Sequence, residues 1–245
     1  MPAAHYHKRK RHDHGQVYNS RPHDWNHQES ERPMNAESAL QTITSTRIVA
    51  GMRGNFPPDV ALRASQALMG EGIRCFEMLM NSQQPIAAMQ ALKAEYGDEA
   101  CVGMGTALSA EAARQALDAG ADFIVSPAFQ PEVVQAALDS DVLVAPGVAT
   151  PTEAVAAWAM GPPLLKLFPI GALGVDYFAA IFGPLGHMRF MCNGAMNDQN
   201  ARELIQAGAV AVGMGGWLVG DGSWGKSRLR SRARILVNAV ESVGN

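Results

Sequence analysis

Short apolar runs alternate with helix-like segments from about residue 36 onward, and this repeat limits the fold more than any other feature of the sequence. Eight runs predict strands: Arg47–Met52, Arg74–Leu79, Ala100–Gly103, Phe123–Ser126, Val142–Ala145, Leu164–Phe168, Met188–Cys192 and Val210–Met214. Apolar strands separated by helices indicate parallel βαβ units that are buried on both faces. Eight units predict an α/β fold, a single (β/α)8 TIM barrel with its active site at the carboxyl ends of the strands. An open doubly wound sheet is the alternative, but no G-x-G-x-x-G motif follows the first run.

The helix-like segments carry start and stop signals that support this division. Thr150–Glu153 combines an N-cap threonine, a proline at the first helical position and the glutamate of a capping box. Ser109 and Asn197 can cap two further helices, and Gly120 and Gly208 follow their ends, where a left-handed residue is favoured.

The last helix-compatible segment, Lys226–Arg234, carries five cations at alternate positions. This spacing is expected to scatter the charges around a helix instead of forming one stripe. A solvated closing helix is therefore favoured over a binding patch, with Trp217 and Trp224 placed to pack it against the barrel.

Composition excludes several classes of function. The chain has 245 residues, of which 47% are hydrophobic, so it can bury a substantial core. Its apolar stretches are interrupted well short of the ~20 residues that a bilayer requires. The net charge of -3 gives no electrostatic case for nucleic acid or anionic lipid, so small molecules are the expected partners. Cys75, Cys101 and Cys192 lack C-x-x-C spacing and predict buried thiols in a reducing, cytoplasmic compartment.

Residues 1–33 form a polar, histidine-rich extension that is predicted to be disordered, and residues 34–245 form the predicted barrel domain. The extension holds six of the seven histidines and the basic block Lys8–Arg11, but no apolar core of a signal peptide. Adventitious metal or polyanion binding is one reading, although the histidine spacing gives no closed metal site. A dispensable extension is favoured, and a start at Met34 is expected to cost the fold nothing.

Lys166 lies inside the sixth apolar run and is one of three lysines beyond the extension. Desolvation disfavours the ammonium ion, lowers the lysine pKa and leaves a neutral amine that can attack a carbonyl, as in Schiff-base enzymes. The alternative is a strand-end lysine whose charged head reaches water along its own methylenes.

Glu77 lies between Phe76 and Met78 in the second predicted strand. Burial favours the neutral form of a carboxyl group and suits it to proton transfer near neutrality. The alternative is a structural partner of Arg53 or Arg74, since buried carboxylates are usually paired. A glutamate and a lysine that point into one barrel provide an acid/base group and a nucleophile.

Other residues follow the carboxyl ends of the predicted strands: Arg53, Thr106, Pro127, Gly147, Gly194, Ala195, Gly215 and Gly216. The last four belong to the loops after strands seven and eight, where small residues let backbone N–H groups approach an anion and where barrels frequently bind phosphate. Tight turns that need positive φ are the alternative explanation of the glycines.

Several segments together resemble one enzyme family. Lys166-Leu167-Phe168-Pro169 is similar to a Schiff-base segment, and Phe76–Ser82 is similar to the segment that bears the catalytic glutamate. Further matches follow in the right order: Met52–Gly54, Gly103–Thr106, Val125–Pro127 and Pro146–Thr150. From about Thr46 to Asp221 the chain thus resembles the class I aldolases that cleave 2-keto-3-deoxy-6-phosphogluconate and its galactonate epimer. Asn81-Ser82 is closer to the galactonate branch.

The resemblance implies residue roles. Lys166 forms the imine, Glu77 shuttles protons through water, and Arg53 and Thr106 hold the 2-keto acid. Pro127, Gly147, Phe168 and the four late-loop residues complete the implied substrate site. The implied products are pyruvate and glyceraldehyde 3-phosphate, no metal or other cofactor is implied, and the family suggests a homotrimer.

Departures from the family concern the substrate more than the reaction. The usual Gly-Gly after strand seven is Gly194-Ala195, and a usual serine is replaced by Gly216, which removes a hydroxyl donor to phosphate. The usual Ser or Ala and Glu after the lysine-strand proline become Ile170 and Gly171. An aldolase for 4-hydroxy-2-oxoglutarate, an oxaloacetate decarboxylase and a non-catalytic phosphate-sugar-binding barrel remain open alternatives.

Overall fold

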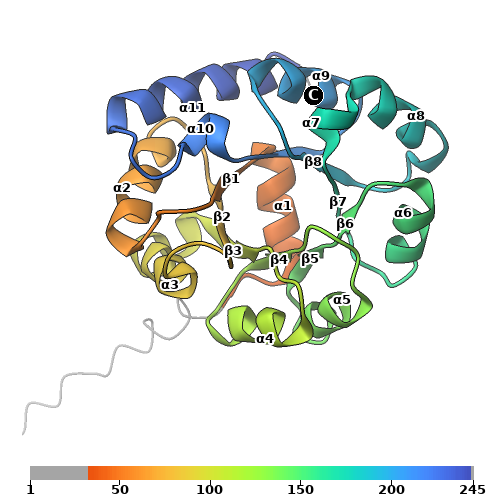
Figure 1. Cartoon of the computed structure of the whole chain (residues 1–245), viewed down its shortest axis with the longest axis horizontal. Coiled ribbons are helices and arrows are strands. Elements are labelled where there is room, and N and C mark those ends of the chain that lie inside the picture. The colour runs from red at the N-terminus through yellow and green to blue at the C-terminus, as the bar shows by residue number, and fades with distance from the viewer. Residues whose placement is uncertain (1–32, 244–245) are drawn as a thin grey trace, which may run out of the picture.

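The computed structural model describes residues 33–243, which form a (β/α)8 TIM barrel (Figure 1). The predicted disorder of the histidine-rich extension falls on residues outside this range, except residue 33. The sheet is parallel, with the strand order β5-β4-β3-β2-β1-β9-β8-β7-β6. Its strands are β1 (Ile48–Met52), β2 (Cys75–Leu79), β3 (Cys101–Gly105), β4 (Phe123–Val125), β5 (Leu143–Ala145), β6 (Gly147–Val148), β7 (Leu165–Leu167), β8 (Phe190–Asn193) and β9 (Ala211–Met214). All eight predicted strands are present.

The fifth predicted strand continues past its predicted end and is divided by Pro146 into β5 and β6. Proline has no N–H to donate, so regular pairing stops at this residue. β5 pairs with β4 and β6 pairs with β7, while the Pro146 carbonyl accepts a hydrogen bond of 2.9 Å from the Lys166 N–H. One bent strand therefore closes the ring of eight.

Helices surround the barrel in Figure 1. They are α1 (Ala36–Thr46), α2 (Pro58–Met69), α3 (Pro85–Tyr96), α4 (Ala110–Asp118), α5 (Pro131–Leu138), α6 (Pro151–Trp158), α7 (Ile170–Leu173), α8 (Val175–Leu185), α9 (Asp198–Gln206), α10 (Gly216–Val219) and α11 (Lys226–Glu241), with a 3-10 turn at Gly97–Glu99. The predicted caps are confirmed. Ser109 and Asn197 accept backbone N–H groups of α4 and α9, and Thr150 and Glu153 form the capping box of α6.

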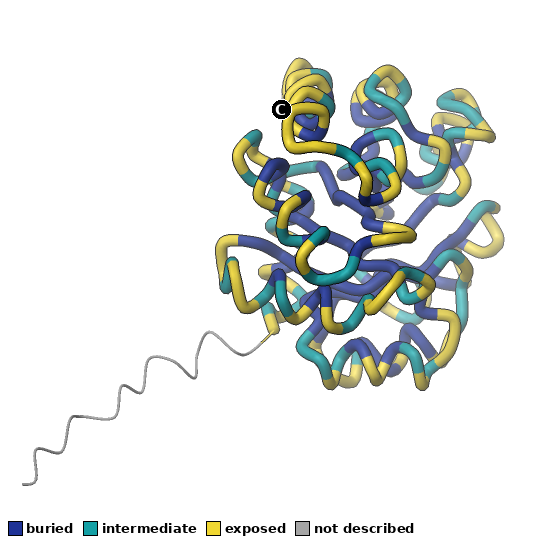
Figure 2. Tube along the Cα trace, turned by 60° about the vertical axis from the view of Figure 1, so that its left-hand side comes forward, coloured by how far each residue is buried: buried dark blue, intermediate teal, exposed yellow. Residues whose placement is uncertain are grey.

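α1 is the exception to the outer ring, because it lies across the centre of the barrel (Figure 1). Its Ala39 and Ile43 are buried against residues that face the barrel interior, among them Val49, Cys75 and Met191. The tube in Figure 2 shows the same separation, with buried strands inside and the exposed sides of the helices outside. α1 therefore fills the amino-terminal end of the barrel and leaves the carboxyl end for a site.

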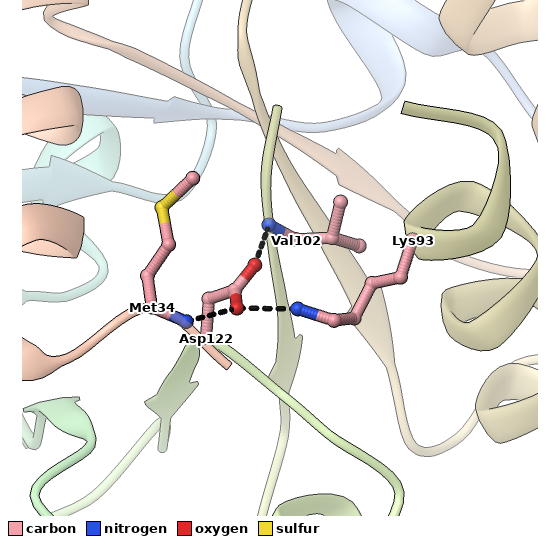
Figure 3. A network of polar contacts seen from close by, with 4 residues as sticks. All are labelled: Met34, Lys93, Val102 and Asp122. Carbon is pink, nitrogen blue, oxygen red and sulfur yellow. Dashed lines mark hydrogen bonds and ion pairs between the residues drawn. The ribbon is translucent and has the colours of Figure 1, made fainter. Parts of the chain in front are cut away.

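A buried carboxylate just before β4 binds the start of the described chain through the contacts drawn in Figure 3. Asp122, which precedes β4 and is fully buried, accepts hydrogen bonds of 2.8 Å from the backbone N–H groups of Met34 and Val102. It also forms an ion pair with Lys93 of α3. The charge of Asp122 is thus neutralised, and α1 is held against β3 and α3.

The closing helix α11 is present, and its packing by Trp217 and Trp224 is confirmed. The expectation that the five cations do not form one stripe is confirmed, because they divide between two faces of the helix, with cations four residues apart sharing a face. Arg228 and Arg232 stack on the two tryptophan rings. The remaining three cations line a separate surface groove: Lys226, Arg230 and Arg234.

Two predictions from composition can also be compared with the structure. Cys75, Cys101 and Cys192 are buried free thiols, as predicted. Among the helices of residues 33–243, none has the length and apolar character needed to cross a bilayer.

Candidate active site

Lys166 occupies the middle of β7, and 4% of its surface is exposed. Burial lowers the pKa of Lys166 below its ordinary value of 10.5; the Glu77 carboxylate opposes this shift and Arg53 adds to it. Within the described residues the amine forms no hydrogen bond or ion pair, and its nitrogen lies 5.1 Å from the centre of the Phe168 ring. The lysine does not reach water as a strand-end residue would, so the nucleophile reading fits the structure better.

Glu77 lies in β2 on the same inner face of the barrel, with 3% of its surface exposed. Its Cα pairs in register with Gly51 of β1 and Gly103 of β3, and residues paired in this way point to one side of the sheet. The alternative pairing with Arg53 or Arg74 is absent from the described part of the chain. The Oε1 atom of Glu77 is buried there without any hydrogen-bond partner.

Glycines make the room that Glu77 occupies. A Cβ atom at Gly105 would lie 1.8 Å from Glu77 Oε1, and one at Gly51 would lie 3.5 Å from Oε2. A side chain at position 105 would therefore displace the carboxylate. The unpartnered oxygen is available to a water molecule or to a bound molecule, since buried polar atoms are usually hydrogen-bonded.

A cavity of about 580 Å³ opens at the carboxyl ends of β1, β2, β7, β8 and β9. Eight of the predicted site residues line it together: Arg53, Glu77, Lys166, Phe168, Gly194, Ala195, Gly215 and Gly216. Residues that are distant in the sequence thus lie together at the carboxyl ends of the strands, as the TIM-barrel fold predicts. The size is ordinary for a small-molecule site.

Three predicted site residues do not line this cavity: Thr106, Pro127 and Gly147. They follow β3, β4 and β5, on the other side of the barrel mouth. A Cβ atom at Gly147 would lie 2.2 Å from the carbonyl carbon of Pro127, so these two residues pack against each other. Gly147 pairs in register with Lys166 and so contributes to the wall behind the lysine.

Asn193 lines the same cavity but is absent from the predicted set. It is the last residue of β8, is 6% exposed, and its Oδ1 atom has no hydrogen-bond partner within the described residues. Its side chain lies over Gly213 of β9, where a Cβ atom would be 1.8 Å from Nδ2. The predicted strand ended one residue too early, at Cys192. A polar residue at the carboxyl end of a strand was the signal that could have found it.

The late loops present unused donors. The backbone N–H groups of Gly194, Ala195, Gly215 and Gly216 donate to no acceptor in the described chain. Positive φ angles of 94° and 53° account for tight turning at Gly194 and Ala195. Gly215 and Gly216 have no positive φ, and the space around their Cα atoms is open. The turn explanation thus covers the first loop and fails for the second, where the glycines leave space for a ligand.

Gly171, one of the departures from the family pattern, supports the first of these loops. Its N–H donates a 2.8 Å hydrogen bond to the Gly194 carbonyl, and a Cβ atom there would lie 2.3 Å from that oxygen. Only glycine fits so close an approach. No group of three or more His, Cys, Asp or Glu side chains within residues 33–243 is arranged to hold a metal ion.

The fold and the two facing side chains define a class: a lysine-dependent aldolase barrel, a lyase that works through a Schiff base. Residues 41–231 match the family model described as KDPG and KHG aldolase, and the chain belongs to this family.

Individual relatives agree with this assignment. The chain is 33% identical to a 2-dehydro-3-deoxy-6-phosphogalactonate aldolase of Escherichia coli K12, over 72% of this chain and 86% of the relative. It is 35% identical to a 2-dehydro-3-deoxy-phosphogluconate aldolase of Treponema pallidum, over 65% and 76% of the two chains. A solved structure described as native KDPGal is similar with a TM-score of 0.76 and 31% identity, covering 80% of this chain and 95% of the other.

Proposed function

We propose that the protein cleaves a 2-keto-3-deoxy-6-phospho sugar acid of the galactonate or gluconate type to pyruvate and glyceraldehyde 3-phosphate. The observation that carries this proposal is a buried lysine that shares a cavity with a buried glutamate; within residues 33–243 the lysine has no ion-pair partner and the Oε1 atom of the glutamate has no hydrogen-bond partner. The named activities of the relatives support the choice of substrate.

Bond cleavage begins at Lys166. Its neutral amine attacks the C2 carbonyl, and loss of water gives an iminium ion. Glu77 then removes the C4 hydroxyl proton through water, and the C3–C4 bond breaks. The bonding electron pair moves into a pyruvate enamine, and the aldehyde leaves.

Turnover is completed by two steps at the same residues. The protonated Glu77 returns its proton to C3 of the enamine, which regenerates the iminium ion. Hydrolysis then releases pyruvate and frees the lysine amine. Arg53 holds the carboxylate of the keto acid, Phe168 covers the imine, and Thr106, Pro127 and Gly147 shape the far wall.

The distal phosphate is held by the late loops. The backbone N–H groups of Gly194, Ala195, Gly215 and Gly216, which have no acceptor in the described part of the chain, are the donors, and they replace the serine hydroxyl that is missing at position 216. If the unphosphorylated sugar acid were cleaved as efficiently as the 6-phosphate, this part of the proposal would be wrong.

A second candidate keeps the same chemistry with a different electrophile. A relative of 31% identity in E. coli K12 is named KHG/KDPG aldolase, so 4-hydroxy-2-oxoglutarate is the alternative substrate. Oxaloacetate decarboxylation would pass through the same enamine. Rates measured across these 2-keto acids separate the candidates.

We further propose that the protein is a cytoplasmic homotrimer. Light scattering tests the oligomeric state.

Borohydride reduction in the presence of pyruvate tests the reaction class. Reduction of the imine is expected to fix one pyruvyl group on Lys166, detected by intact mass and peptide mapping. Lys93 and Lys226 are internal controls, since Lys93 is paired with Asp122 and Lys226 is exposed. A label spread over all three lysines, or no label, contradicts a Schiff-base enzyme.

A further inference from the structure

Two arginines of α11 differ from the other cations of this helix. Arg228 and Arg232 lie four residues apart beside the buried face of the helix, with their guanidinium carbons 3.7 Å and 4.3 Å from the ring centres of Trp224 and Trp217. Both distances lie within the roughly 6 Å at which a cation and an aromatic face attract each other. Lys226, Arg230 and Arg234 lie in the surface groove, and within residues 33–243 they form no cation–π contact with a tryptophan ring.

Trp217 connects this contact to the active site. It belongs to α10, directly after Gly215 and Gly216, and it lines the same cavity as Lys166. α10 lies between α11 and β1, as Figure 1 shows. Arg232 is therefore connected to the Gly215-Gly216 backbone through one side chain, that of Trp217.

The two arginines differ in their acidic neighbours. Asp221 also lines the cavity; hydrogen bonds from Ser223 lower the pKa of this carboxyl, and the nearby Arg228 cation adds to the effect. Arg232 forms no ion pair within the described residues. Its positive charge lies on the far side of the Trp217 ring from the loop that carries glycine at position 216.

We propose that Arg232 is a positioning residue for the phosphate end of the substrate: it acts through the Trp217 ring to hold the Gly215-Gly216 backbone in place and adds its positive charge behind it. This inference rests on the proposed function, because it assumes a phosphorylated substrate. It assigns Arg232 no part in bond cleavage.

Arg232→Gln is the test variant, and Arg230→Gln is the matched control on the same helix. In Arg232→Gln the KM for the 6-phosphate is expected to rise roughly two- to five-fold with little change in kcat. The KM for the same sugar acid without phosphate should not change. Arg232→Lys should recover part of the loss, since lysine keeps the charge but not the planar stacking. Arg230→Gln should resemble the wild type.

Several results would overturn the inference. Equal losses for the phosphorylated and unphosphorylated substrates, an unchanged KM for the 6-phosphate, or the same loss in Arg230→Gln would each do so. If Arg232→Gln does not fold, Arg232→Met keeps the apolar stem and carries the same comparison. Exchange of the pyruvate C3 protons with solvent separates this proposal from the proposed function. If the wild type does not catalyse this exchange, the aldolase function is wrong. If Arg232→Gln catalyses it and keeps the wild-type KM for the 6-phosphate, only the role of Arg232 is wrong.

Discussion

At the scale of single residues, burial of the Lys166 amine lowers the stability of the fold and makes the amine a better nucleophile. Methionine has a similar length and no charge, so Lys166→Met removes the nucleophile and also the cost of burying an ammonium ion. We expect kcat to fall by about 10³-fold or more while the thermal midpoint stays equal or rises. A coupled assay for pyruvate and a thermal melt measure these quantities. A clear drop in the midpoint would show that the amine stabilises the fold.

The same residue predicts a dependence on pH. The pKa of Lys166 is lower in the folded chain than its ordinary value of 10.5, so the unfolded chain binds more protons between the two values. The stability of the wild type should therefore rise with pH across this window, and the advantage of Lys166→Met should shrink as pH approaches 10.5. Urea unfolding of both proteins at several pH values measures the difference. A constant difference across the window contradicts the lowered pKa.

Gly105 gives a residue-scale test of how the site is built. Gly105→Ala is expected to displace Glu77 and lower kcat by about 10²-fold, because the new Cβ atom would overlap Oε1. In a Glu77→Ala background the same substitution should cost almost nothing more, since the overlapping atoms are gone. Steady-state kinetics of the four proteins complete the cycle. Independent losses in the two backgrounds would mean that Gly105 acts in another way.

At the scale of elements, the sequence predicted the strands better than the shape of the barrel mouth. Apolar runs and caps identify strands and helices because those signals are local. The position of Pro146 inside one bent strand depends on pairing with β4 and β7, which are distant in sequence. The expectation that the site lies at the carboxyl ends of the strands predicted that Lys166 and Glu77 lie together. It did not predict that the cavity opens beside β1 and β9 and away from Thr106, because the position of the opening depends on strand tilt and loop packing.

The helix α1 shows how one element can stabilise the barrel without contributing to the site. Ile43 is 1% exposed at the amino-terminal end, opposite the cavity. Ile43→Ala should lower the free energy of unfolding by about 2–5 kcal/mol through the cavity it leaves. Gln41→Ala on the exposed side of the same helix is the control, expected within about 0.5 kcal/mol of the wild type. Urea unfolding measures both free energies. A loss of kcat in folded Ile43→Ala would contradict the idea that α1 stabilises the barrel without affecting the active site.

At the scale of the whole molecule, Asp122 determines where the folded domain has to begin. Its carboxylate accepts the backbone N–H of Met34 at 2.8 Å, and it is the point at which α1, α3 and β3 are joined. In a chain that begins at Met34, the Met34 nitrogen is a terminal amine instead of an amide. At neutral pH this amine is charged, and its hydrogen bond to the Asp122 carboxylate is stronger than that of an amide.

Deletion of residues 1–33 is therefore expected to leave kcat and KM unchanged and to keep or increase stability at pH 7. The increase should be lost as pH rises above roughly 8, where a terminal amine loses its charge. Chemical unfolding of the full-length and shortened proteins at pH 7 and pH 10 measures the effect. Asp122→Asn in the shortened chain is the control and should remove the pH-dependent part, because the amide carries no charge. A shortened protein that is less stable at pH 7, or that has lost activity, would show that the histidine-rich extension belongs to the folded unit.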